Sequence, residues 1–203
     1  MQYTPNHART DRRPMTDTAV RTLDKQRAEF KRNRFLAMPL AGLLVWTLLL
    51  IPGWLLPLPQ AMLALFIGTG CIAYVGMALS KLTGEDFLDK TRPKNDFQAL
   101  FFHGMAQAVL VYAIVIPLAI LEPRAAPMGV GILAGLMWIP FSWIVQHPIG
   151  WWHAGVRTVL ICASWFVWPD AQYVVVPLIV IGCYLFTIPV LEARWRRANA
   201  AHG

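Results

Sequence analysis

The sequence predicts an all-α membrane protein, a bundle of six transmembrane helices with both termini in the cytoplasm. Hydrophobic residues make up 57% of the 203 residues and charged residues 14%, against about 45–50% and about 25% in soluble domains. A run of 46 residues, 35–80, contains no Asp, Glu, Lys or Arg. Because a spanning helix needs roughly 20 apolar residues, this one run holds two spans.

Further charge-free runs place the other four spans. They cover residues 97–121, 125–156, 158–169 and 171–191. The connections on the outer side are short and rich in proline, so the spans that they join are antiparallel neighbours. We expect the spans at about 35–56, 60–80, 98–121, 127–146, 150–168 and 172–192.

The spanning region, 35–192, is predicted to lie between two basic cytoplasmic tails. Residues 1–34 form the first tail, which we expect to be disordered over 1–15 and helical over 16–34, where no Gly or Pro interrupts the chain. Residues 193–203 form the second tail. The only sizeable connection between spans is the loop 82–97, which is also predicted to be cytoplasmic.

The distribution of basic residues fixes the predicted orientation. With the N-terminus inside, 17 of the 18 Lys and Arg residues fall on the inner side and only Arg124 falls outside. This asymmetry is the positive-inside rule, and it indicates a multi-pass membrane protein with both termini inside. The net charge of +7 is therefore a signal of topology and not of a nucleic-acid partner. The basic tail suits anionic lipid headgroups.

Arg157 is the one charge predicted to lie within a span. The charge-free run beyond it, 158–169, has 12 residues, about 18 Å of helix at about 1.5 Å per residue, whereas the hydrocarbon core is about 30 Å thick. The fifth span must extend past Arg157 toward the cytoplasm, so this side chain is expected to face the bundle or a wet inner cavity. Counting from the turn at 169–172 places Tyr184 at the same depth.

Other polar residues gather toward the inner halves of the spans. His103 and Gln107 are four residues apart and share one face of the third span. We expect them, with Arg157 and Tyr184, to line an inward-facing polar pocket that binds an anionic headgroup or a small solute. Secondary candidates for this pocket lie around the connection between the fourth and fifth spans: Ser142, Gln146, His147 and His153.

Two alternative roles for these polar residues stay open. They can serve as interhelical hydrogen-bonding and interfacial groups, or two histidines on facing helices can hold haem or a metal. No catalytic motif is found, so no enzymatic activity is predicted. No cofactor or metal is predicted either, because the three cysteines, Cys71, Cys162 and Cys183, fall inside spans without a Cys-x-x-Cys motif.

Short motifs in the spans resemble an uncharacterised family of small bacterial membrane proteins with six spans. The resemblance covers roughly residues 35–190 and implies a bacterial cytoplasmic-membrane setting, with no catalytic or binding residues to carry over. The motifs that carry it are Gly68-Thr69-Gly70, Ser80-Lys81-Leu82 and Ile139-Pro140-Phe141-Ser142-Trp143-Ile144.

The sequence is compatible with two kinds of function. Prolines within the spans and the polar inner halves favour a small transporter or channel-like protein. The alternative is a non-transporting membrane protein that binds or regulates a partner through its basic tail and the loop 82–97. The lipid bilayer is the expected partner in both cases, and the chain can also assemble as a homo-oligomer.

Overall fold

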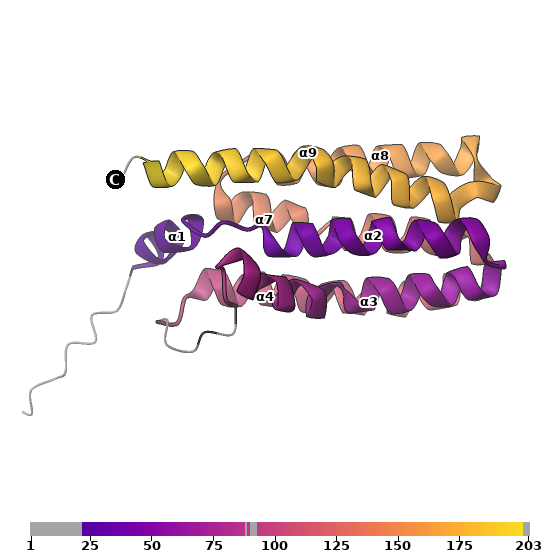
Figure 1. The fold of residues 1–203 in the computed structure, drawn as a ribbon, viewed down its shortest axis with the longest axis horizontal. Coiled ribbons are helices and arrows are strands. Elements are labelled where there is room, and N and C mark those ends of the chain that lie inside the picture. The colour runs from indigo at the N-terminus through magenta and orange to yellow at the C-terminus, as the bar shows by residue number, and fades with distance from the viewer. Residues whose placement is uncertain (1–21, 88, 90–92, 201–203) are drawn as a thin grey trace, which may run out of the picture.

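A computed structural model describes residues 22–87, 89 and 93–200. These residues form helices and no strand, and most of the helices run side by side along one long axis (Figure 1). The predicted disordered segment 1–15 and the beginning of the predicted helix 16–34 lie outside the described residues. The α-helices are α1 (Leu23–Lys31), α2 (Ala37–Leu55), α3 (Leu58–Thr83), α4 (Asp96–Leu110), α5 (Tyr112–Leu121), α6 (Ala126–Gly135), α7 (Trp138–Val145), α8 (Ile149–Val167) and α9 (Gln172–Ala200).

Five segments of the described chain are long and apolar enough to cross a membrane. They comprise α2, α3, α4 with α5, α6 with α7, and α9. The prediction of an all-helical protein with several apolar helices is therefore confirmed. The remaining long helix, α8, has 19 residues, as many as α2, but it carries Arg157 and is not among these five.

Local sequence explains where several helices begin and end. Helix α1 begins after Thr22, whose side-chain oxygen accepts a hydrogen bond from the N–H of Lys25 at 3.4 Å. Helix α3 ends at Gly84, which has a φ of 76°. Glycine adopts this left-handed backbone without steric cost, so the chain can reverse here toward the next segment.

Helix α2 lies at the centre of the bundle, packed between α3 and α9, while α8 packs against α9, α6 and α7. Glycines allow the closest approaches. Gly42 of α2 faces the Tyr184 ring of α9 so closely that a Cβ atom would overlap it. Gly150 of α8 similarly lies against the backbone of Trp138 in α7. Small residues at such positions let membrane helices come together and gain dispersion contacts.

The first described helix and the last one meet at the same end of the bundle (Figure 1). Arg34, just before α2, donates from Nε and a terminal nitrogen to the two carboxylate oxygens of Glu192 at 2.8 and 2.9 Å. Arg194 donates to the carbonyl oxygens of Lys31 and Asn33 at 2.8 and 2.9 Å. We call this group of contacts the end cluster; it ties the end of α9 to the segment that joins α1 and α2.

Candidate binding site

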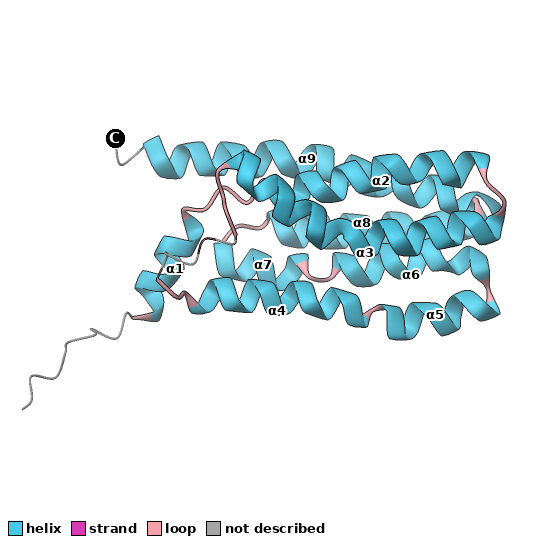
Figure 2. Ribbon diagram, turned by 60° about the horizontal axis from the view of Figure 1, so that its bottom comes forward, coloured by secondary structure: helices cyan, strands magenta, loops and turns pink. Residues whose placement is uncertain are grey.

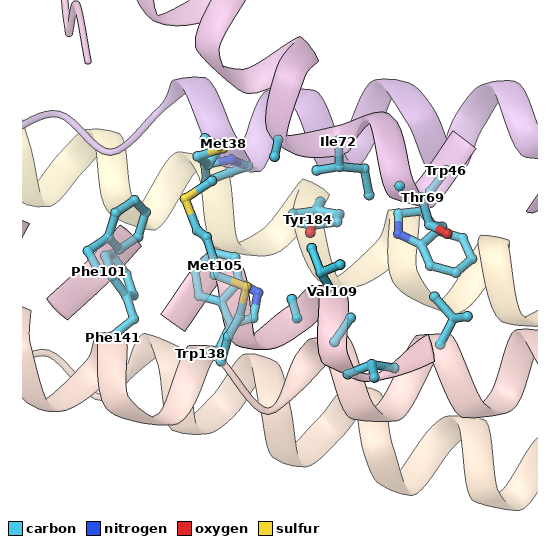
Figure 3. A pocket seen from close by; sticks show the side chains of 18 of the residues that line it. Met38, Trp46, Thr69, Ile72, Phe101, Met105, Val109, Trp138, Phe141 and Tyr184 are labelled. Atoms are coloured by element: carbon cyan, nitrogen blue, oxygen red, sulfur yellow. The ribbon is translucent and has the colours of Figure 1, made fainter. Parts of the chain in front are cut away.

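A cavity of about 130 Å³ lies inside the bundle, between α2, α3, α4, α6 and α7 (Figure 3). Its walls are mostly aromatic, aliphatic and methionine side chains. They include Met38, Met105, Met137, Trp138, Phe141 and Tyr184. It reaches Phe35 and Glu85 at the end near α1, and Trp46 and Tyr112 deeper in the bundle.

Arg157 projects from α8 into the wall of this cavity. Its exposed fraction is 2%, and its guanidinium carbon lies 5.6 Å from the centre of the Trp46 ring, which gives a cation–π contact. A Cβ atom on Gly135 would lie 3.1 Å from Cδ and Nε of Arg157, so the glycine makes room for the side chain. The charge expected within the fifth span is therefore buried in the bundle and does not point to lipid headgroups.

This buried charge has no carboxylate partner in the described chain. Nε of Arg157 is buried without a hydrogen-bond acceptor, and none of the ion pairs among the described residues includes Arg157. A buried cation costs several kcal/mol unless it is paired and hydrogen-bonded. Arg157 is thus a deeply buried cation whose charge no carboxylate of the described residues compensates.

Tyr184 and His153 stand next to Arg157. Tyr184 of α9 lines the cavity and interacts electrostatically with the guanidinium. His153, one helical turn before Arg157, is fully buried, stacks on Trp138 with ring centres 4.2 Å apart, and its Nδ1 lies 2.9 Å from the Thr187 hydroxyl. The histidine therefore supports the cavity wall from behind Trp138, and it is not among the residues that line the cavity.

Glu85 lies at the other end of the cavity and has a different role. Its Oε1 accepts the N–H groups of Leu36 and Ala37 at 2.7 and 2.8 Å, which caps the beginning of α2. Ala37 precedes Trp46 by nine residues, about 14 Å of helix at about 1.5 Å per residue. Glu85 is therefore too far along the bundle to neutralise Arg157.

The cavity adjoins irregular turns in two of the long apolar helical segments. Regular α-helical hydrogen bonding is interrupted at Val111, between α4 and α5, and at residues 136–137, between α6 and α7, although the backbone keeps right-handed helical φ and ψ there (Figure 2). Val111 and Met137 both line the cavity. Local departures from regular α-helical bonding occur at hinges and functional sites.

The structure does not bring His103 and Gln107 to the cavity. Both are exposed on the outer face of α4, where His103 Nδ1 lies 2.7 Å from the carbonyl oxygen of Ala99. Their spacing does place them on one face, but the opposite face of the helix, with Met105 and Ala108, lines the cavity.

The secondary candidates around the α7–α8 connection form its turn. Ser142 donates to the carbonyl oxygen of His147, and His147 Nδ1 accepts the N–H of Ile149 at 3.2 Å. Gln146, with a φ of 53°, accepts a hydrogen bond from Nζ of Lys31 at 2.7 Å. Burial and the nearby charge of Arg194 lower the pKa of His147. These residues stabilise the connection and lie outside the cavity.

Metal binding has no obvious place in the part of the chain that the structure describes, since no three His, Cys, Asp or Glu side chains gather there. Sequence reasoning did not connect Trp46 or Gly135 with Arg157, whose side chain lies against both. Both stand in uniformly apolar segments, where nothing in the residue pattern distinguishes a cavity wall from a lipid-facing surface.

The described residues define an all-helical fold with several membrane-length helices and a deeply buried arginine beside an apolar cavity. The model of DUF7010, a family of unknown function, matches residues 23–194, and the chain belongs to this family. The expectation of an uncharacterised family is thereby confirmed. No curated protein and no solved structure matches the chain.

Proposed function

We propose that this chain is a small membrane transport protein that binds an anion at Arg157. The observation that carries the proposal is the guanidinium itself, which is 2% exposed and has no carboxylate partner within the described residues. Guanidinium groups recognise carboxylates and phosphates through paired hydrogen bonds. An anion that enters the cavity would compensate a charge that the protein otherwise keeps at a cost.

The proposal places the protein in the bacterial cytoplasmic membrane, with α8 as a sixth span and both ends of the chain inside. The 19 residues of α8 make about 28 Å of helix at about 1.5 Å per residue, close to the hydrocarbon thickness of about 30 Å. Its polar residues His153, Arg157 and Ser164 are all buried in the bundle. The 17-to-1 distribution of basic residues supports the orientation.

The two irregular helical turns beside the cavity favour transport over a purely structural role. A turn with irregular hydrogen bonding lets a helix bend at a defined point. Pro117 in α5 and Pro140 in α7 lie in the same helical segments, and proline weakens a helix by removing a backbone hydrogen bond.

Thermal unfolding of the purified protein in detergent tests anion binding. Acetate, inorganic phosphate, palmitate and lysophosphatidate are added in turn to the wild type and to Arg157→Gln. At least one of these anions should raise the Tm of the wild type, because a ligand at about 100 times its Kd stabilises by about 2.7 kcal/mol. The same anion should leave Arg157→Gln unchanged. Arg124→Gln is the matched control, since Arg124 is exposed and pairs with Glu122 and Asp170 at the opposite end.

Two results would overturn the proposal: no anion stabilises the wild type, or every stabilising anion acts equally on Arg157→Gln. Uptake of the stabilising anion into proteoliposomes then separates transport from binding. We expect uptake by the wild type and by Arg124→Gln, and none by Arg157→Gln.

A regulatory protein is the second candidate, and the docking of α1 favours it. Gln26 donates from Nε2 to Asp96 at 3.1 Å and accepts the Asp96 N–H at 2.7 Å, while Arg27 lies over the rings of Phe97 and Trp143. These contacts attach α1 to α4 and α7 near the end of the cavity that Phe35 and Glu85 line. If anion uptake by Gln26→Ala equals that of the wild type, α1 has no control over the cavity.

A further inference from the structure

We infer that the ligand of the Arg157 cavity is a single-chain anionic amphiphile, with a carboxylate or phosphate head, that enters from the lipid between α3 and α4. The inference rests on the proposed function and specifies its substrate. Three features carry it: the chemistry of the cavity wall, the position of its opening and its size.

The wall offers one cationic group and otherwise little that could replace water around an ion. Two polar side chains, Thr69 and Tyr112, bond to each other, with their hydroxyl oxygens 2.6 Å apart. Oε1 of Glu85 caps α2, and its Oε2 is buried without a hydrogen-bond partner at the far end of the cavity from Arg157. Arg157, with Tyr184 beside it, is therefore the place for a charged head. A small hydrated anion would lose its water against apolar walls without compensation, whereas the chain of an amphiphile gains from the same walls.

The cavity reaches the outer surface of the bundle at a depth where that surface meets lipid. Val109 of α4 and Gly70 of α3 both line the cavity, and both are exposed, Val109 by 61%. Gly70 lies at the middle of α3, and Val109 lies at the middle of the spanning segment Asp96–Leu121. This opening therefore faces the hydrocarbon layer, not the water on either side.

The packing of the bundle explains why an opening exists there. Helix α3 packs chiefly on α2, while α4 packs on α1, α5 and α7. The two helices therefore face each other across the cavity, and the bond between Thr69 and Tyr112 joins them on one side of the opening at Gly70. A chain can lie in this gap without displacing a packed helix.

The size of the cavity indicates that part of the ligand stays in the lipid. Its 130 Å³ is well below the roughly 300–1,000 Å³ of a pocket that encloses a drug-sized ligand. The cavity can hold a head and the first carbons of a chain. The rest of the chain would extend through the opening beside Val109 and Gly70 into the bilayer.

Equilibrium binding of radiolabelled palmitate and lysophosphatidate to the purified protein tests this inference. The two ligands distinguish a carboxylate head from a phosphate head, and tight binding of either supports the inference. Arg157→Gln should weaken binding about tenfold or more, because charged hydrogen bonds are lost. Acetate and inorganic phosphate in 100-fold excess should fail to compete, since they lack a chain.

The opening is tested separately with Gly70→Leu, a variant that remains informative even if Arg157→Gln fails to fold. A Cβ atom at Gly70 meets nothing closer than the Tyr112 hydroxyl at 3.9 Å, so the larger side chain fits the helix and narrows the opening. We expect binding of the labelled amphiphile to fall about fivefold or more, as apolar contact area is lost. Gly182→Leu is the matched control, because Gly182 is exposed on α9 with open space around it, and its binding should equal that of the wild type.

The outcomes separate this inference from the proposed function. If acetate or inorganic phosphate competes as well as the labelled amphiphile, or if Gly70→Leu binds normally, the site binds anions but takes no amphiphile through this opening. If no anion binds in an Arg157-dependent way, both proposals fail. Lysophosphatidylcholine is the zwitterionic control, and binding as tight as that of lysophosphatidate would show a lipid groove that ignores charge, which also overturns both.

Discussion

Arg194 in the end cluster and Arg157 in the cavity are two arginines in very different surroundings. The guanidinium of Arg194 donates to two backbone carbonyl oxygens at 2.8 and 2.9 Å and lies over the Phe35 ring. The guanidinium of Arg157 is more deeply buried, yet it has an aromatic ring and a tyrosine beside it and no carboxylate in the described structure. Nε of both side chains is buried without a hydrogen-bond acceptor, and neither arginine is in an ion pair among the described residues. The difference lies in what surrounds the rest of each guanidinium: Arg194 joins two backbone carbonyl groups to α9, whereas Arg157 lines an apolar cavity.

The largest expected effect comes from removing the charge of Arg194 in the end cluster. Arg194→Gln should lower the free energy of unfolding by about 2–4 kcal/mol, because two hydrogen bonds from a charged group are lost and the two carbonyl groups lose their donor. The measurement is thermal unfolding in detergent, with Arg196→Gln as the control. The Arg196 side chain is 72% exposed and pairs only with Glu192 among the described residues, so its loss should cost about 0–1 kcal/mol. Equal Tm values for the two variants would show that Arg194 contributes no more to stability than the exposed Arg196.

A smaller effect is expected from Glu85, the carboxylate at the end of the cavity near α1. Glu85→Ala should cost about 1–2 kcal/mol, because the first N–H groups of α2 lose their cap. Glu85→Gln should cost less, since the amide oxygen can still accept both hydrogen bonds. If Glu85→Ala instead abolished amphiphile binding without any change in Tm, Glu85 would belong to the binding site and not to the frame around it.

The smallest effect is a pH dependence confined to the end of the bundle near Arg194. The lowered pKa of His147 means that the unfolded chain, with an ordinary histidine pKa of about 6.5, binds the proton more readily. Stability should therefore decrease as the pH falls below about 6.5, and protonation also removes the Nδ1 acceptor of Ile149 N–H. His147→Asn should flatten the profile of Tm against pH between 7 and 5. An unchanged profile would mean that another group titrates there.

Part of this architecture could be predicted from the sequence because charge is costly in lipid. Charge-free runs indicated the apolar helices, and the short run after Arg157 showed that this residue had to turn inward. The depth count paired it with Tyr184, which lines the same cavity. These inferences need only the spacing of residues along a helix and its constant rise per residue, so they can be made from the sequence.

What the sequence could not predict depends on how helices rotate and pack. The spacing of His103 and Gln107 shows that they share a face, but not that the face points away from the bundle. The cap on α2 comes from Glu85, 48 or 49 positions away from the groups that it binds. The wall beside Arg157 consists of apolar residues such as Trp46 within apolar segments, so no local pattern marks it.

The most direct test of the central claim compares the wild type with Arg157→Met by thermal unfolding, each with and without bound anionic amphiphile. Without the ligand, the variant should be at least as stable as the wild type, because an unpaired buried charge is replaced by an apolar chain of similar length. With palmitate or lysophosphatidate, the Tm of the wild type should rise and that of the variant should not. A variant that is several kcal/mol less stable than the wild type without ligand, and that still responds to the amphiphile, would contradict the account. In that case Arg157 would be a structural cation like Arg194.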